Sequence, residues 1–217
     1  MSARLRAGRI RRVKYFRTDE INEFIGALEH CSELAASIVD DTTRWKWLVL
    51  ALHNALQGAC VCALRGRDTS GIAVLTKDSA AAVWKWLENG RHTQPCPPIP
   101  REKLAPMVAL YQRVQQAEYL NEPHRLPPNP QHDRNVRALN KLRNEWSHFV
   151  LHGWSVEIIG LPGICESCFE IIEYLSLTHS TFGHQLKKVH RNRITSALRS
   201  LRGAVVNCKK AYSNGTE

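Results

Sequence analysis

The stretch RWKWLVLALHNALQGACVCAL, residues 44–64, is apolar on almost every side of a helix. A helix without a polar face is buried on all sides, so this stretch predicts the central helix of a helical core. The stretch is also long enough to span a bilayer. In a membrane, however, four polar side chains would lie at or near the costly interior: Lys46, His53, Asn54 and Gln57. We therefore expect a buried core helix and no membrane partner.

Helical periodicity continues on both sides of this stretch, and strand patterning is scarce. Apolar residues at helical spacing predict further helices over 19–40, 78–88, 102–120, 131–150, 162–177 and 183–210. Thr18 and Asp19 are typical of a helix N-cap. The proline-rich residues 91–100 predict a connector, and residues 154–159 an extended bridge. The expected fold class is all-α, an antiparallel helical bundle with additional helices that forms one domain over residues 18–217.

Positive charge is concentrated at the two ends of the chain. The 217 residues carry a formal net charge of +10. Residues 1–17, a basic N-terminal arm, hold seven basic and no acidic side chains, and residues 183–217 hold eight basic side chains and one acidic one. Such segments are typical of nucleic-acid ligands, and equally of solvated tails and helix faces. The RNA-binding candidates lie on the basic C-terminal helix, 183–210: Lys187, Lys188, Arg191 and Arg193.

Cysteine usage and the N-terminal sequence bear on the compartment. The seven cysteines are an odd number at scattered positions, which is typical of reduced thiols in a cytosol. The N-terminal arm lacks the apolar stretch of a secretory signal. We expect a cytoplasmic protein.

Residues 139–148, LNKLRNEWSH, place reactive side chains on one predicted helix. The apolar members and the next residue share a stripe that predicts contact with the core: Leu139, Leu142, Trp146 and Phe149. Asn144 and His148 lie one turn apart on the opposite face, and Arg143 flanks them. Histidine transfers protons near neutral pH, arginine stabilises charge on phosphate, and asparagine orients either group. This trio predicts phosphodiester cleavage without a metal or another cofactor.

The stretch RNEWSH, residues 143–148, resembles the motif of HEPN domains (higher eukaryotes and prokaryotes nucleotide-binding), an arginine and a polar residue followed at short spacing by a histidine. Three further stretches are similar to a bacterial and plasmid-borne HEPN subgroup: LHNALQG at 52–58, EPHRLPP at 122–128 and HGWSVE at 152–157. The resemblance covers roughly residues 20–180. It implies a helical bundle, often dimeric, and in many members a metal-independent ribonuclease of toxin–antitoxin, CRISPR or stress systems.

Function and partners are expected to follow from this resemblance. In-line attack by a 2′-hydroxyl needs a base and an acid on opposite sides of the phosphorus, and two copies in a symmetric dimer would supply both. We expect a metal-independent endoribonuclease of toxin or defence type that acts through a composite dimer site. Its catalytic residues are Arg143, Asn144 and His148, and its partners are RNA, a second copy and a protein antitoxin. Two alternatives stay open: a non-catalytic RNA- or protein-binding module, and an enzyme acting on nucleotides.

Four more residues are candidates for a supporting role around this site: His53, Asn54, Glu145 and His152. His53 interrupts the apolar central helix, either to hydrogen-bond a neighbouring helix or to reach the Arg143 site. Glu145 would repel phosphate unless a cation pairs with it. His152 is a site residue or a loop histidine, because Gly153 ends the helix.

Metal binding and nucleotide hydrolysis by a P-loop are not expected. Four residues approach the ligand count of a zinc site: Cys165, Cys168, His179 and His184. The intervening residues read as continuous helix with no hairpin, which favours core thiols. The chain has no glycine-rich phosphate loop. We therefore expect neither a metal site nor a cofactor.

Overall fold

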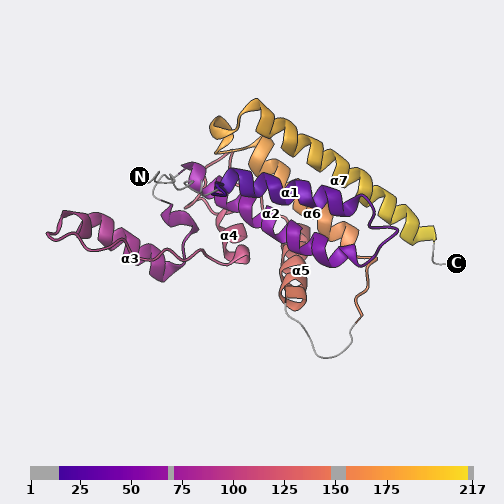
Figure 1. Cartoon of the computed structure of the whole chain (residues 1–217), viewed down its shortest axis with the longest axis horizontal. Helices are drawn as coiled ribbons and strands as arrows, with labels where there is room; N and C mark the ends of the chain where they lie inside the picture. The colour runs from indigo at the N-terminus through magenta and orange to yellow at the C-terminus, as the bar shows by residue number, and fades with distance from the viewer. Residues whose placement is uncertain (1–14, 68–70, 148–154, 215–217) are drawn as a thin grey trace, which may run out of the picture.

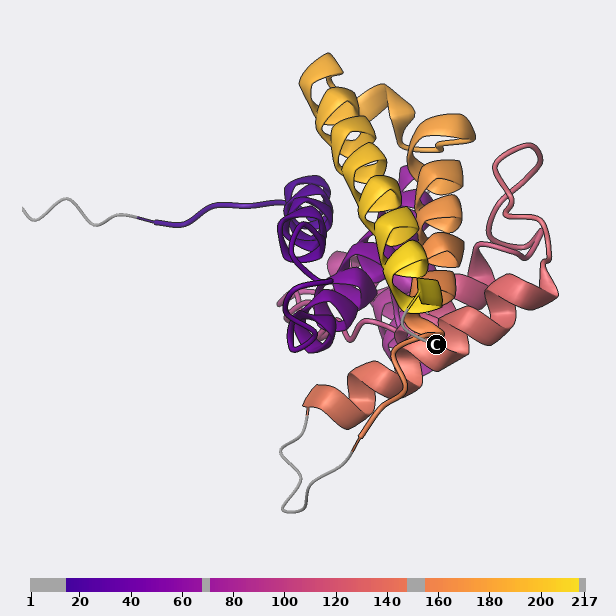
Figure 2. The same cartoon turned by 90° about the vertical axis from the view of Figure 1, so that its right-hand side faces the viewer.

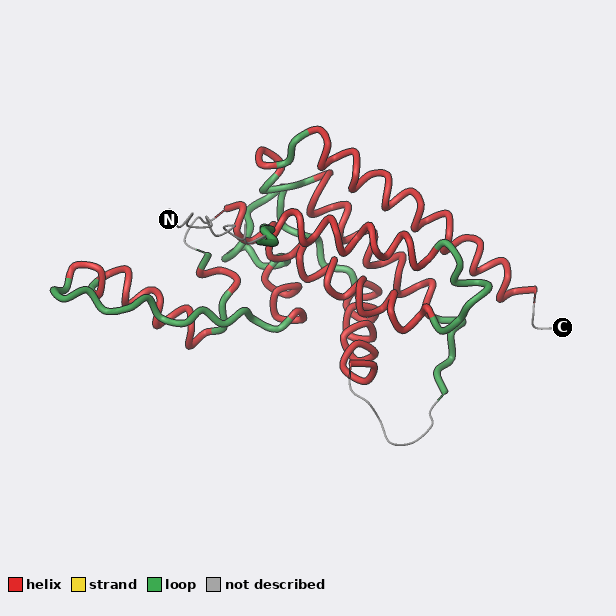
Figure 3. The backbone as a smooth tube through the Cα atoms, in the orientation of Figure 1, coloured by secondary structure: helices red, strands yellow, loops and turns green. Residues whose placement is uncertain are grey.

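The fold consists of helices joined by turns and longer loops (Figures 1 and 3). The computed structural model describes residues 15–67, 71–147 and 155–214. Within these ranges it contains no strand, only an isolated bridge between Leu75 and Leu104. The longer helices are α1 (Glu20–Ala35), α2 (Arg44–Arg67), α3 (Lys77–Glu88), α4 (Met107–Arg113), α5 (Pro130–Ser147), α6 (Leu161–Glu173) and α7 (Lys188–Asn214). The all-α class is therefore confirmed.

Helix α2 is the predicted central helix. It contacts α1, α4, α5 and α6. Trp47 is exposed, but five of the helix's other large side chains are fully buried: Trp45, Leu48, Leu52, Leu56 and Leu64. Residues 44–66 are long and apolar enough to cross a membrane, but 67% of their most apolar window is buried inside the protein. Burial by neighbouring helices accounts for the missing polar face.

Helices α1 and α2 approach each other closely at Gly58. A Cβ atom at this position would lie 3.0 Å from the Cβ and 3.2 Å from the Cα of Phe24, so only glycine fits without a shift of α1. Asp19 is the N-cap of α1, as predicted, because its side chain accepts a hydrogen bond from the backbone N–H of Asn22 at 2.8 Å. The prediction that this helix continues to Asp40 is wrong: α1 ends at Ala35 and residues 36–40 form turns.

Residues 77–100 form a separate projection from the body, with α3 on one side and a proline-rich return segment on the other (Figure 1). The connector predicted at 91–100 is confirmed, apart from a 3₁₀ turn at Gly90–His92. The return segment is held by Trp86, whose indole N–H donates to the carbonyl of Pro97 at 3.0 Å.

The helix predicted over 102–120 is wrong, because most of this segment is not helical. Residues 103–105 instead pair with 74–76: the N–H of Thr76 donates to Lys103, and that of Ala105 to Val74, both at 2.9 Å. Helix α4 therefore begins only after Pro106 and ends at Arg113. The Arg113 guanidinium donates to the carbonyls of Ala73 and Leu75, both at 2.8 Å, and so helps to fix this pairing.

The last two helices pack together, and α7 also contacts α1. Helix α6 ends at Glu173, and a π turn over Tyr174–Thr178 follows it directly. The predicted end near 177 is therefore correct for the helical segment as a whole, but its last turn is π rather than α. The basic C-terminal helix begins at Lys188 rather than at Gly183, because Gly183–Gln185 form a 3₁₀ turn that precedes it.

Candidate functional site on helix α5

Helix α5 carries the predicted site and lies across one side of the body (Figure 2). Its start is fixed by Asn129, whose Oδ1 accepts the N–H of Gln131 at 2.9 Å, and by Pro130 at the first helical position. Leu139 and Trp146 are buried, as the predicted apolar stripe requires. This packing leaves the opposite face, with Asn144, exposed to solvent.

Arg143 and Asn144 lie side by side on the last turn of α5. Arg143 is half-buried, and its Nη1 donates to Oδ1 of Asn144 at 3.1 Å. Asn144 is exposed, and its backbone carbonyl accepts the hydroxyl of Ser147 at 3.1 Å. The amide thus holds the guanidinium in one orientation at the surface, where an anion can reach it.

His53 of α2 joins this site from the core side. Its side chain is 4% exposed, and its Nε2 lies 3.4 Å from Oδ1 of Asn140 on α5. Burial lowers the pKa of His53 below its usual 6.5, and the nearby charge of Arg143 lowers it further, against the opposing effect of hydrogen bonds to Asn140 and Asn54. His53 is therefore neutral at pH 7. His53 therefore lies within hydrogen-bond distance of a neighbouring helix, as one interpretation predicts, and its supporting role at the Arg143 site stays a prediction.

Among the described residues, the structure does not bring the other supporting candidates into a hydrogen bond or ion pair with Arg143. Asn54 is exposed and lines a hollow against α1 together with Ala27 and Gly58. Glu145 is exposed, and its carboxylate lies 3.9 Å from Nζ of Lys141, its one ion-pair partner among the described residues. His148 and His152 lie outside the described residues. Sequence reasoning missed Asn140, although its position three residues before Arg143 on the same helix was a usable signal.

No group of His, Cys, Asp or Glu side chains in the described part of the chain is arranged to hold a metal ion. Cys165 and Cys168 are both buried, and burial raises the pKa of each thiol well above its ordinary value. They are therefore protonated, and they pack in the core rather than act as thiolate ligands.

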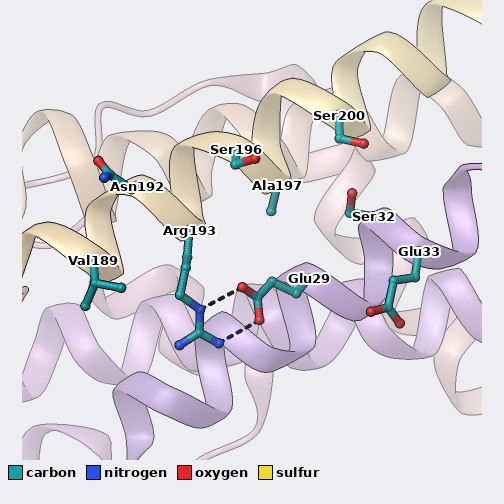
Figure 4. A pocket seen from close by; sticks show the side chains of 9 residues that line it. All are labelled: Glu29, Ser32, Glu33, Val189, Asn192, Arg193, Ser196, Ala197 and Ser200. Carbon is teal, nitrogen blue, oxygen red and sulfur yellow. Dashed lines mark hydrogen bonds and ion pairs between the residues drawn. The ribbon is translucent and has the colours of Figure 1, made fainter.

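Two of the four RNA-binding candidates are already engaged within the chain. Nε and Nη2 of Arg193 donate to the carboxylate of Glu29 at 2.7 and 2.6 Å, and this pair bridges α7 and α1 (Figure 4). The hydrogen bond from Arg193 lowers the pKa of Glu29. Arg191 donates to the carbonyl of Gly183 at 2.8 Å. Of the four, only Lys187 and Lys188 are exposed.

The hollow beside this ion pair is a groove between α1 and α7 of about 700 Å³. Small polar side chains from both helices line it (Figure 4): Ser32, Asn192, Ser196 and Ser200. Arg143 does not line this groove, nor any of the other main hollows in the described part of the chain.

Comparison of the chain with protein-family models, with curated proteins and with solved structures gives no match. The resemblance to HEPN domains therefore rests on the residues quoted above.

Proposed function

We propose that this protein is a metal-independent endoribonuclease of the HEPN type, with a toxin or defence role in the cytoplasm. The observation that carries the proposal is the guanidinium of Arg143, which donates to Asn144 on the last turn of α5, five residues before His148 in the sequence. A cation, an amide and an imidazole suit phosphodiester cleavage without a metal, because they stabilise charge on the phosphate, orient the reacting groups and transfer a proton.

The reaction is an in-line displacement at phosphorus. The 2′-oxygen of the ribose attacks the adjacent phosphate and loses its proton to a general base. The bond from phosphorus to the 5′-oxygen breaks, and this oxygen takes a proton from a general acid. The products are a 2′,3′-cyclic phosphate and a 5′-hydroxyl. Arg143 stabilises the charge on the phosphate oxygens, Asn144 orients the guanidinium, and His148 transfers a proton.

A second copy of the chain supplies the second proton-transfer group. The obvious candidate within one chain is His53, but at 4% exposure it does not reach a substrate. Its role is to position Asn140 and Arg143 from behind. A symmetric dimer brings two His148 side chains to one phosphate, one acting as base and the other as acid. A protein antitoxin that covers this composite site would silence it.

A non-catalytic RNA- or protein-binding module is the second candidate, and Glu145 favours its protein-binding form. Its carboxylate is exposed next to Asn144, and its one cationic neighbour in the described part of the chain, Lys141, is 3.9 Å away. A weakly compensated carboxylate at this point opposes the approach of a phosphate.

RNA cleavage by the purified protein in EDTA distinguishes these two functions. The wild type is expected to produce discrete fragments of total RNA, and His148→Ala and Arg143→Ala to produce none. His92→Ala is the matched control, because His92 is exposed on the projection at residues 77–100. Size measurement of each variant shows whether the dimer persists. An intact wild-type dimer that cleaves nothing would establish the binding module instead.

A further inference from the structure

Three basic side chains form a line along the outer face of α5: Arg134, Arg137 and Lys141, here called the α5 stripe. All three are exposed, on the side of the helix away from the buried Leu139. Their spacings of three and four residues keep them on one face, about 4.5 and 6 Å apart along the helix axis. One turn beyond Lys141, the same face carries Asn144.

The charge of the α5 stripe is largely uncompensated. Arg137 has no ion-pair partner among the described residues, and Arg134 donates to a neutral group, Oε1 of Gln131, at 2.6 Å. Lys141 has only the distant carboxylate of Glu145. Asp133, the other acidic residue of α5, accepts the hydroxyl of Tyr111 at 2.8 Å and forms no ion pair with a described residue, so the three cations of the stripe still outnumber the two carboxylates of the helix. The stripe therefore presents a positive field to solvent.

Helix α7 has more basic residues but no comparable line. Three of them are paired with carboxylates of α1 and α6, as Arg193–Glu29, Arg202–Glu173 and Lys209–Glu166. The exposed cations that remain on one face are Lys188, Arg199 and Lys210, each eleven residues from the next. This is about 16 Å along the axis, too far apart to follow successive phosphates of one strand.

We propose that the α5 stripe binds the phosphates of a single-stranded RNA and leads the strand to Arg143 and Asn144. The assignment to RNA rests on the proposed function; the assignment to a phosphate backbone rests on the charge and on its spacing of one cation per helical turn. A cationic line of this kind follows a nucleic-acid backbone without reading its sequence.

A hollow beside the stripe favours a single strand over a duplex. It has a volume of about 370 Å³ and lies between α4 and α5, next to Arg137. Gln112, Gln115 and Gln116 line it together with Asp133, and the Gln115 amide donates to the carbonyl of Tyr111 at 3.4 Å. Such amides hydrogen-bond to the edges of nucleobases, which are accessible when a base is unstacked from a single strand.

The test measures RNA affinity as a function of salt, with the full-length wild-type chain. The probe is a single-stranded 20-nucleotide 2′-O-methyl oligouridine, which the proposed reaction cannot cleave because it has no free 2′-hydroxyl. The variant is Arg137→Gln with Lys141→Gln. The matched control is Arg199→Gln with Lys210→Gln, the same change of charge at two exposed positions of α7.

Each phosphate contact adds about 0.7 to the slope of log affinity against log salt for a single strand. The α5 variant is expected to lose about 1.4 from this slope, so the wild type falls about sevenfold more than the variant between 50 and 200 mM salt. The α7 control keeps the wild-type slope. Equal losses in both variants, no loss in either, or equal binding of a duplex competitor would overturn the proposal.

Cleavage in EDTA, assayed in parallel on unmodified RNA, separates this proposal from the proposed function. RNA binding through the α5 stripe without any cleavage would support the stripe as an RNA-binding surface and contradict the proposed ribonuclease. Cleavage that depends on His148, together with an unchanged slope of log affinity against log salt in the α5 variant, would support the ribonuclease and contradict RNA binding by the stripe.

Discussion

Arg193 and Arg137 are expected to respond to the same substitution in opposite ways. Arg193 holds α7 against α1 through two hydrogen bonds to Glu29, whereas Arg137 has no ion-pair partner among the residues described. Arg193→Gln should therefore destabilise the fold with little effect on RNA binding. Arg137→Gln should weaken RNA binding and leave stability nearly unchanged.

The size of the Arg193 effect follows from its geometry and exposure. Two short charge-assisted bonds favour a large value, but the side chains of Arg193 and Glu29 are each 37% exposed, so solvent screens the pair. The expected loss is about 1 kcal/mol, at the upper end for surface pairs. For a chain of 217 residues this corresponds to a decrease in Tm of roughly 2–4 °C.

Urea unfolding and RNA titration of both variants measure these two effects. A double-mutant cycle with Glu29→Gln assigns the stability term to the pair, and a coupling free energy of about 1 kcal/mol is expected. Arg137→Gln should change the free energy of unfolding by less than about 0.5 kcal/mol. The reasoning is refuted if Arg193→Gln leaves stability unchanged and lowers RNA affinity as much as Arg137→Gln does.

Three further predictions concern stability. Because burial keeps the pKa of His53 below 6.5 in the folded state, the unfolded chain binds more protons between the two pKa values, and stability falls as the pH is lowered through 6.5. His53→Gln should lose less stability than the wild type between pH 7.5 and 5.5 in urea unfolding; an equal loss would contradict this. Leu52→Ala should cost about 2–5 kcal/mol, since Leu52 is fully buried in α2, and a loss below 1 kcal/mol would exclude a central role for this helix. Gly58→Ala should lower Tm because its Cβ would meet Phe24, whereas Gly203→Ala, with nothing within 4 Å, should raise stability by about 0.5–1 kcal/mol; a gain in both would disprove the close approach.

Local periodicity was sufficient to predict the helices that bury a clear apolar face. The central helix α2, the N-cap at Asp19 and the buried side of α5 were all predicted, because each depends on residues within a few turns. The helix predicted over 102–120 was wrong for the opposite reason. Its first residues pair with backbone groups of 74–76, about thirty residues away, and no local pattern contains that information.

In the candidate site, too, features that depend on neighbouring residues were predicted, and contacts between distant residues were not. The helical wheel predicted the outward position of Asn144 and the flanking position of Arg143 correctly. The bond of Arg193 to Glu29 joins residues 164 positions apart, so the sequence did not show that this candidate is already paired. The α5 stripe was missed because residues 18–182 are slightly acidic in sum, which concealed a local line of positive charge.

Cleavage of a single RNA sequence with and without one 2′-hydroxyl tests the central claim most directly. The substrate is an oligonucleotide that the wild type cleaves in EDTA, and its partner has a 2′-deoxyribose at the cleaved position. We predict that the RNA yields a 2′,3′-cyclic phosphate and a 5′-hydroxyl, that the deoxy partner stays intact, and that His148→Ala cleaves neither. Equal cleavage of both substrates, or cleavage that persists in His148→Ala, would contradict the proposed ribonuclease.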